Sequence, residues 1–405
     1  MQEFKMYDVI IVGAGASGLV AAIVLARRGK KVLVLEKNSK VGKKLLATGN
    51  GRCNITNQKP TPNRFHSQNP AFVEQVLDGY GYQSIKRFFR TIGLELIEAK
   101  EQKVFPMSLQ ASSVVELLEA ECEALGVEIG CGCEVKRILN QKRRYIVQYD
   151  QGEASSLALV VATGHLSAPN LGGVDDGVKF AKGFGHRVIE AYPSLVQLTS
   201  PIKNLKRLSG VKVEARVRCG DVERLGDLLF TTYGISGLAI LDISRVVVQR
   251  LKREKHILLE IDLMPKMTHE QLFSLMKKSL KNHASKPIKL WLQGFINKKL
   301  ILPILEPLKL EKKSVSTILS HPKELKSIVN GIKKFPFRID GSRGFNGAEV
   351  ATGGVDTQEI DPKTMESKKQ KGLYFIGEVL DVDGDRGGFN LHFAWVCGMR
   401  AGEEV

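Results

Sequence analysis

The sequence predicts an α/β fold in which the two ends of the chain form one dinucleotide-binding sheet and the middle forms a β-rich insert. Three observations predict this class. A strand, a glycine turn and a helix open the chain, and a second glycine-rich turn with acidic residues follows a strand near its end. Between them, apolar and polar residues first alternate at period two and then follow a helical pattern. The 405 residues suffice for two or three domains.

The first element is a β-branched strand over 7–12, followed at once by a glycine turn and a helix over 19–28. In that context Gly13 permits the sharp turn, Gly15 lets the backbone approach a pyrophosphate, and Gly18 lets helix and strand pack closely. The turn residues between them, Ala16 and Ser17, belong to the predicted phosphate site at the helix N-terminus. The apolar run over 9–26 could instead be a membrane span, but three glycines at fingerprint spacing and the lack of a cleavage site argue against it.

A second strand over 31–35 ends at Glu36 and Lys37. An acidic residue about 20 residues beyond the glycines is placed to bind ribose hydroxyls and disfavours a 2′-phosphate. The fingerprint alone does not separate NAD, NADP and FAD.

The C-terminal end of the chain narrows the choice among NAD, NADP and FAD. A strand over 157–161 runs into the small-residue turn Ala162, Thr163 and Gly164, and a strand over 372–376 runs into Gly377 and Glu378. Backbone passes close to a nucleotide at such turns, and a carboxylate there can bind the ribityl chain. The acidic turn that follows contains Asp385, Gly387, Gly388, Phe389 and Asn390, and it opens a helix over 391–401 whose positive end can face the flavin. Together the two ends imply FAD.

A third segment, over 42–57, is rich in glycine and asparagine and is predicted to be an ordered loop that uses positive φ angles. We predict cofactor contacts from one run within it: Lys44, Thr48, Gly49, Asn50, Gly51 and Arg52.

The middle of the chain is basic and differently patterned. Residues 201–340 hold 28 Lys and Arg against 13 Asp and Glu, which leaves a balance of only +2 for the rest of the +17 chain. Such asymmetry suits a surface that meets phosphates, although a solvated basic face without a partner is an equal alternative. Strands are predicted over 210–217, 228–233 and 335–339, and helices from a capping box at Thr268 and over 290–305.

The six cysteines show no CxxC pair and no zinc spacing, so we expect reduced thiols, a cytoplasmic location and no metal site. The close pair Cys131 and Cys133 falls in a predicted strand over 127–135, where buried free cysteine is common.

The chain resembles the HI0933-like (YhiN-type) flavoproteins. The resemblance runs almost end to end and rests on four segments: the loop over 43–57, the stretch over 228–237, the run over 351–355, and the segment over 377–390. It implies three domains: an FAD-binding domain over 1–190 and 341–405, a β-rich domain over 191–265 and 332–340, and a helical domain over 266–331. His165, Leu238 and His392 depart from the residues usual there, which are glycine, proline and glutamine.

The resemblance implies three possible activities: uridine reduction in large-subunit ribosomal RNA, reduction of unsaturated bile acids, and oxidation of aminoacetone. Alkene reduction needs a proton donor beside the flavin, whereas amine oxidation needs no strong acid. The candidates are Cys53, His392, Lys44 and Arg52, with Asp383 and Asp385 nearby. For Cys53 and His392 a structural role is the alternative, and the aspartates can instead cap the final helix.

The sequence contains no second nucleotide fingerprint. We therefore expect NADH or NADPH to enter the same cleft transiently, or the substrate to reduce the flavin and oxygen to reoxidise it. The preferred hypothesis is an NAD(P)H-driven reductase of uridine in 23S ribosomal RNA, with phosphates held by residues 201–340. The alternatives are a small-molecule flavoenzyme, either an amine oxidase or an enone reductase, and a non-catalytic RNA- or ribosome-binding flavoprotein.

Overall fold

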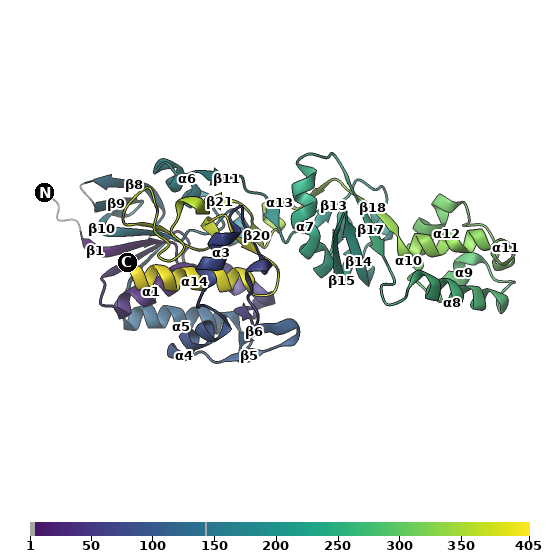
Figure 1. The fold of residues 1–405 in the computed structure, drawn as a ribbon, viewed down its shortest axis with the longest axis horizontal. Helices are drawn as coiled ribbons and strands as arrows, with labels where there is room; N and C mark the ends of the chain where they lie inside the picture. Colours follow the sequence, from purple (N-terminus) through teal and green to yellow (C-terminus); the bar gives the residue numbers. More distant parts are fainter. Residues whose placement is uncertain (1–4, 142–143) are drawn as a thin grey trace. The chain divides into compact units, whose positions relative to one another are not determined.

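The structure is a computed structural model that describes residues 5–141 and 144–405. It divides into two compact units. Unit 1 comprises the described residues up to Tyr192 together with Glu349–Val405, and unit 2 comprises Pro193–Ala348 (Figure 1).

Unit 1 is organised around a seven-stranded mixed sheet. In the order β7-β2-β1-β10-β9-β8, the strands are β7 (Glu128–Cys131), β2 (Val32–Glu36), β1 (Met6–Val12), β10 (Gly152–Val161), β9 (Arg144–Tyr149) and β8 (Val135–Gln141). The C-terminal part of β10 also pairs in parallel with β22 (Leu373–Phe375), whereas its N-terminal part pairs antiparallel with β9. The last strand of the nucleotide sheet therefore comes from the far end of the sequence, as predicted.

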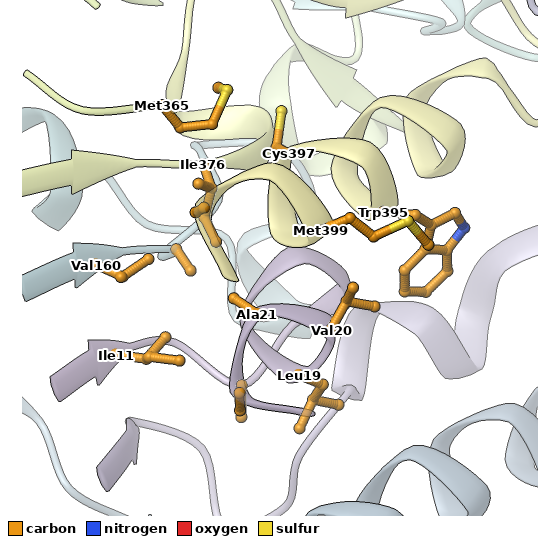
Figure 2. Packing of buried hydrophobic residues seen from close by; sticks show 14 of the residues in the cluster. Ile11, Leu19, Val20, Ala21, Val160, Met365, Ile376, Trp395, Cys397 and Met399 are labelled. Carbon is orange, nitrogen blue, oxygen red and sulfur yellow. The ribbon is translucent and has the colours of Figure 1, made fainter. Parts of the chain in front are cut away.

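The central strands read as continuous β-branched and leucine runs because they are buried on both faces; every residue of β2 is buried. Beside the sheet, α1 (Ala16–Arg27) packs on α14 (Phe389–Glu404), as the side chains of Val20 and Met399 show in Figure 2. α1 also packs on α5 (Ala111–Ala124). Two glycines allow α14 to approach closely. A Cβ at Gly398 would lie 2.5 Å from the Ser17 carbonyl oxygen, and one at Gly402 would lie 2.6 Å from the Val24 Cβ.

The other elements of unit 1 are short and carry the loops around the predicted site. They are α2 (Lys43–Ala47), β3 (Thr56–Asn57), β4 (Phe65–His66), α3 (Pro70–Leu77), α4 (Tyr82–Thr91), β5 (Leu96–Glu98), β6 (Lys103–Pro106), α6 (Asp176–Gly183), β11 (Val188–Ile189), β20 (Val350–Ala351), β21 (Gly354–Val355) and β23 (Asp383–Gly384). β3, β6 and β5 form a small antiparallel sheet, and β23 pairs with β4.

Unit 2 contains a seven-stranded antiparallel sheet. In the order β18-β17-β14-β15-β16-β13-β19, the strands are β18 (Phe335–Ile339), β17 (Ile257–Asp262), β14 (Lys212–Cys219), β15 (Val222–Phe230), β16 (Gly234–Ser236), β13 (Leu198–Thr199) and β19 (Gly341–Ser342), and β12 (Pro193–Ser194) and α13 (Gly344–Gly347) complete this part. Ala215, Val217 and Cys219 of β14 are buried between exposed polar residues, which matches the predicted alternation. α7 (Leu238–Leu251) packs on β14 and β15.

Five helices follow β17 in unit 2: α8 (His269–Lys281), α9 (Ile288–Leu292), α10 (Lys298–Leu305), α11 (Val315–Ser320) and α12 (Pro322–Lys333). The capping box at the start of α8 is confirmed. The Gln271 backbone N–H donates to Thr268 Oγ1 over 3.2 Å, and the Thr268 N–H donates to Gln271 Oε1 over 2.9 Å.

Two secondary-structure predictions were wrong in extent. The helix predicted over 290–305 is two helices, because the chain turns at Gly294 and Asn297 caps α10 by accepting from the Lys299 N–H over 3.0 Å. The strand predicted over 127–135 ends at Cys131, because Gly132 adopts φ +69° and turns the chain before β8.

The two units differ from the predicted domain bounds at two places. Residues 191–192 belong to unit 1 rather than to the β-rich part. Residues 341–348 belong to unit 2 rather than to the nucleotide-binding part, because β19 pairs with β13. The division into two units leaves 266–331 together with the β-rich part, so a separate helical domain stays a prediction. In the described part of the chain, no helix combines the length and apolar character needed to cross a bilayer.

Candidate flavin site

The glycine turn between β1 and α1 has the geometry that a bound pyrophosphate requires. Gly13 adopts φ +108°, and a Cβ there would lie 2.5 Å from the Ala162 carbonyl oxygen. A Cβ at Gly18 would lie 2.0 Å from the Gly13 carbonyl oxygen. At Gly15, by contrast, an added Cβ meets no protein atom within 4 Å. The protein itself packs against Gly13 and Gly18, whereas the space at Gly15 suits a ligand.

Gly15 is also the N-cap of α1, and no side chain caps this helix end. The first N–H groups of a helix have no intrahelical acceptor, so they are oriented to bind an anion. The predicted contacts at Ala16 and Ser17 fit this arrangement.

Glu36 lies where a ribose would meet the turn. Its Oε2 accepts from the Ala14 backbone N–H over 2.8 Å, and its Oε1 accepts from the Asn38 N–H over 2.7 Å and from Asn38 Nδ2 over 2.6 Å. A carboxylate has about four acceptor positions, so it can still accept from a hydroxyl. Lys37 is instead engaged elsewhere, at 3.0 Å from Glu134 and 3.4 Å from Asp176.

A partly buried polar cluster joins four segments of unit 1 that are distant in the sequence. Lys44 Nζ lies 2.6 Å from Glu378 Oε2, and Ser167 Oγ donates to Glu378 Oε1 over 2.6 Å. The Ala351 backbone N–H donates to the same oxygen over 3.1 Å. Burial alone would raise the pKa of Glu378, but Lys44 and these donors hold it below its usual range. Glu378 is therefore a fixed carboxylate, as a hydrogen-bond acceptor for ribityl hydroxyls should be.

Both small-residue turns lie beside this cluster. Gly164 adopts φ +68°, and a Cβ there would be 3.9 Å from Glu378 Oε2. A Cβ at Gly377 would be 2.7 Å from Ser17 Oγ. Close to Gly164, Thr163 Oγ1 would be only 2.1 Å from a Cβ at Gly177 in α6. The predicted residues from 13–18, 162–164 and 377–378 are thus brought together.

The loop after α2 holds an unusual run of left-handed residues. Gly49, Asn50 and Gly51 have φ of 58°, 56° and 79°, and Cys53 has φ of 58°. Asn50 and Cys53 are not glycine, so this backbone is strained, and strain of this kind is found at ligand sites. Thr48 Oγ1 donates to the Leu45 carbonyl over 2.7 Å and so stiffens the start of the loop.

Two predicted catalytic residues have the surroundings of structural groups. Cys53 is fully buried, and burial raises the pKa of its thiol to about 12. His392 is also fully buried, with Nδ1 2.8 Å from Thr56 Oγ1 and Nε2 3.0 Å from the Tyr80 carbonyl oxygen. Burial lowers the pKa of His392 to about 4. Both ring nitrogens are occupied, so this geometry supports the structural alternative.

Arg52 is exposed, donates from Nε to the Gly49 carbonyl over 3.2 Å, and lies 5.1 Å from the centroid of the Phe105 ring. It holds the strained loop from outside.

The acidic turn before α14 is fixed by its own hydrogen bonds. Asp385 accepts from Arg64 Nε over 2.7 Å and lies 2.9 Å from His66 Nε2. Burial would raise the pKa of Asp385, but His66 and Arg64 hold it below its usual range. Asn390 exchanges hydrogen bonds with the Gly384 backbone N–H and carbonyl over 2.7 and 2.8 Å.

The start of α14 depends on two glycines. The Gly387 carbonyl accepts from Asn57 Nδ2 over 3.2 Å, and a Cβ at Gly388 would lie 2.4 Å from the Thr56 carbonyl oxygen. Gly388 is the N-cap of α14 and no side chain caps the helix, which leaves its positive end open to a ligand. Phe389 is 1% exposed and contacts Phe65 edge-on at 5.8 Å between centroids, so it belongs to the core.

Several residues of this region escaped the sequence reasoning, because isolated polar residues gave no pattern. They include Arg64, His66 and Ser167, whereas Asn57 and Ala351 appear in the sequence analysis only as parts of the segments over 43–57 and 351–355. His165 was noted only as a departure from glycine. It is buried, and in the described part of the chain neither of its ring nitrogens has a hydrogen-bond partner. Burial lowers its pKa.

Comparison with known proteins decides the family. The model of the HI0933-like protein Rossmann domain matches residues 7–404. The chain belongs to the HI0933-like family. It is therefore an FAD-dependent oxidoreductase, and the reading of a non-catalytic flavoprotein is not retained. The glycine turns, the uncapped start of α1 and the carboxylates of Glu36 and Glu378 are the groups that would hold FAD.

Relatives in this family carry different names. The chain is 34% identical over 403 residues to the 3-dehydro-bile acid delta(4,6)-reductase of Clostridium scindens, with 97% of each chain covered. It is 37% identical over 394 residues to the ribosomal RNA dihydrouridine synthase of Haemophilus influenzae, with 95% of each covered. The Escherichia coli protein of the same name is 31% identical over 99% of this chain and 98% of its own length.

Solved structures show the same fold at low identity. The 3-ketosteroid delta1-dehydrogenase of Sterolibacterium denitrificans matches with a TM-score of 0.57 at 12% identity, covering 98% of this chain and 99% of that one. The 3-ketosteroid-delta4-(5alpha)-dehydrogenase of Rhodococcus jostii RHA1 matches with a TM-score of 0.52 at 14% identity, covering 99% of this chain and 98% of that one.

Among the described residues no group of three or more metal-ligating side chains is found.

Proposed function

We propose that the protein is an NAD(P)H-driven reductase of a carbon–carbon double bond, and that its substrate is a uridine in 23S ribosomal RNA. The names of the long relatives support the first part. A delta(4,6)-reductase and a dihydrouridine synthase both add two hydrogens across a double bond of the substrate.

The observation that carries the RNA part is the charge distribution. The excess of 28 Lys and Arg over 13 Asp and Glu is confined to residues 201–340, all of which belong to unit 2. A small neutral or anionic substrate needs at most a few cations, whereas a folded RNA presents many phosphates to a broad surface.

Bound FAD would supply the hydride, taken from NADH or NADPH that enters transiently. The chain must then hold the flavin and supply the second hydrogen as a proton. Of the four residues predicted for catalysis, Cys53 and His392 are buried and satisfied, and Arg52 holds a loop and is a very weak acid. Lys44 is hydrogen-bonded to Ser167 and Glu378, so we assign this cluster the task of holding the proton.

The test is mass-spectrometric measurement of dihydrouridine in 23S ribosomal RNA from cells with and without the gene. We expect the modification to disappear on deletion, to return with the wild-type gene, and not to return with Gly15→Ala, which targets the flavin space alone. Unchanged dihydrouridine in the deletion strain would contradict the proposal.

A cytoplasmic location belongs to the same proposal, since all six cysteines are free thiols.

The second candidate is a small-molecule enone reductase, favoured by the 34% identity to the bile-acid reductase over 97% of the chain. It predicts turnover of an unsaturated 3-oxo steroid with NAD(P)H and no RNA. An amine oxidase would instead release hydrogen peroxide from an amine such as aminoacetone without any nicotinamide. Absorbance of the flavin in the purified protein distinguishes the three enzymes. NAD(P)H bleaches the flavin of either reductase, and RNA or an enone then restores the colour; in an amine oxidase the amine bleaches it and oxygen restores it.

A further inference from the structure

The helical part of unit 2, residues 266–331, has a charge pattern of its own. It contains 13 lysines, no arginine, four glutamates and no aspartate. The positive charge of the insert is therefore concentrated on these helices, and it is carried only by ammonium groups.

Several cations on and beside the sheet of unit 2 are paired with carboxylates. There Lys212 lies 2.8 Å from Asp227, and Arg218 lies 2.7 Å from Glu223. Lys266, between the sheet and α8, lies 2.6 Å from Glu214. These charges are neutralised within the protein, so they leave little field for a partner.

On the helices the ammonium groups are mostly unpaired. Lys313 pairs with Glu324, and Lys299 donates to the Ser209 carbonyl over 2.7 Å. Ten other lysines are exposed and have no acidic partner within the described ranges. They are Lys277, Lys278, Lys281, Lys286, Lys289, Lys298, Lys309, Lys312, Lys323 and Lys326.

Backbone contacts bring a subset of them to one place. The segment 284–288 runs beside 313–316: the Val315 N–H donates to the Lys286 carbonyl over 2.9 Å, and the Ile288 N–H donates to the Lys313 carbonyl over 3.1 Å. This pairing sets the connection between α8 and α9 against the segment before α11 (Figure 1). Six exposed lysines lie on or next to these two segments, and we call them the α8–α9 lysine cluster. Lys277, Lys278 and Lys281 lie at the end of α8, Lys286 in the connection, Lys289 in α9, and Lys312 directly before the second segment.

Local helix stabilisation explains only part of the cluster. Lys278 and Lys281 occupy the last turn of α8, where cations complement the helix dipole. Lys286 and Lys312 lie in connecting segments and gain nothing from it. Like charges gathered on one surface repel one another, and a bound polyanion relieves that repulsion.

The chemistry of the cluster indicates how RNA would be held. Lysine contacts phosphate as a point charge, whereas base reading in nucleic acids favours the two-pronged guanidinium of arginine, which this part lacks. The nearby Trp291 is buried and packs on Phe295 at 5.0 Å between centroids, so it offers no stacking surface for bases.

We propose that the α8–α9 lysine cluster is a docking surface for RNA that binds the phosphate backbone without reading its sequence. The proposal rests on the proposed RNA substrate and adds which surface of the chain holds it. Selection of the target uridine is then left to other residues.

The test compares two charge-reversed triple variants of the full-length holoprotein. Lys281→Glu/Lys286→Glu/Lys289→Glu removes half of the cluster. Lys182→Glu/Lys363→Glu/Lys371→Glu changes net charge equally at exposed, unpaired lysines of unit 1. Binding of a fluorescent, unmodified transcript of a 23S ribosomal RNA fragment is measured by anisotropy between about 50 and 200 mM salt, the range over which phosphate contacts weaken strongly.

We expect the cluster variant to bind at least ~10-fold more weakly at low salt and to show a shallower log–log salt dependence, by ~2 for three lost phosphate contacts to single-stranded RNA. The unit 1 variant should lose no more than ~3-fold, because only its overall charge has changed. Flavin absorbance and melting temperature verify folding. The milder Lys281→Gln/Lys286→Gln/Lys289→Gln set should give an intermediate loss if reversal harms α8.

Equal losses in both charge-reversed variants, or no loss in the cluster variant, would overturn the proposal. So would a wild-type protein that binds anionic phospholipid vesicles but not the transcript. The proposed function is judged separately by dihydrouridine. If the cluster variant binds and modifies ribosomal RNA normally, the docking surface is wrong and the function stands. If wild-type protein neither binds the transcript nor forms dihydrouridine, both are wrong.

Discussion

Unit 1 and the helices of unit 2 treat charge in opposite ways. In unit 1, Glu378 is hydrogen-bonded by Lys44, Ser167 and a backbone N–H, and Asp385 is hydrogen-bonded by Arg64 and His66. In the helical part of unit 2, residues such as Lys286, between α8 and α9, carry charges that meet only solvent within the described structure.

In our proposal the two arrangements serve two roles: unit 1 holds the cofactor, and the helices of unit 2 bind the RNA. A cofactor site built from backbone contacts and enclosed ion pairs tolerates little change, whereas exposed lysines can be gained or lost at small cost in stability. Relatives that match nearly the whole chain can therefore keep the flavin and differ in substrate, as their names indicate.

The largest effect is expected at the glycine turn of unit 1. Gly18→Ala places a Cβ 2.0 Å from the Gly13 carbonyl oxygen, so the apoprotein should lose about 3 kcal/mol of unfolding free energy. Gly15→Ala meets no protein atom within 4 Å and should change apoprotein stability by no more than about 1 kcal/mol. It should still weaken FAD binding at least ~10-fold, because the backbone can no longer approach the pyrophosphate. Denaturant unfolding of apoprotein and flavin fluorescence titration measure the two quantities. If the two variants lost the same unfolding free energy and the same FAD affinity, the conclusion that Gly18 contacts protein and Gly15 contacts the cofactor would be wrong.

The enclosed ion pair gives the next effect. Lys44→Met leaves the Glu378 carboxylate without its cation, and because both side chains are partly exposed we expect a loss of about 2 to 3 kcal/mol. Since the folded-state pKa of Glu378 is lowered, its stabilisation is present above the ordinary carboxyl pKa and is lost as pH falls through the folded value. In Lys44→Met the folded-state pKa of Glu378 is no longer held down, so the part of the acid-induced loss that comes from this group should become smaller. The control Lys44→Met/Glu378→Gln should recover part of the loss in the same urea titrations.

His392 tests the structural interpretation by pH. Its pKa is about 4 in the folded protein against 6.5 as the ordinary value. As pH falls from about 6.5 toward 4 the unfolded chain takes up a proton that the folded protein refuses, so stability falls by about 2 kcal/mol. His392→Gln can still bond to Thr56 and to the Tyr80 carbonyl, and it should flatten this part of the stability–pH curve. Some slope will remain, since burial also lowers the pKa of His186. A variant that loses turnover while its stability–pH curve stays unchanged would instead favour catalysis by His392.

The smallest effect is expected in unit 2. Thr268→Ala removes the side chain that accepts from the Gln271 N–H at the start of α8, at a cost of about 1 kcal/mol. Thr268→Ser keeps the acceptor and serves as the control. Hydrogen exchange that rises across 266–331 but not in the unit 2 sheet would show that the helices open independently. Uniform change throughout unit 2 would mean that they unfold with the sheet.

What the sequence predicted well is local. The turn around Gly13 and the capping box at Thr268 are each defined by residues within six positions of one another, so their spacing alone specifies their geometry. The helix predicted over 290–305 was wrong because its apolar pattern continues across Gly294, where the chain turns. The apolar pattern indicates which residues are buried, and α9 and α10 both bury apolar residues although the chain turns between them.

What the sequence could not predict depends on distant partners. Lys44 meets Glu378 across 334 positions, and Thr56 meets His392 across 336. A single sequence contains no spacing that reports such pairs. The sequence therefore does not reveal the two hydrogen bonds that make His392 a structural residue, and it gives no signal for Ser167 beside Glu378.

The packing of α14 on α1 has a consequence for the order of events on the ribosome. β22 completes the nucleotide sheet and α14 covers α1, yet both are synthesised after the whole of Pro193–Ala348. At about 5 to 20 residues per second, those residues delay completion by roughly 8 to 30 s. During that time the side of α1 that will receive Gly398 and Gly402 is uncovered. A nascent chain arrested before Glu349 should therefore fail to capture FAD and should depend on chaperones to stay out of aggregates.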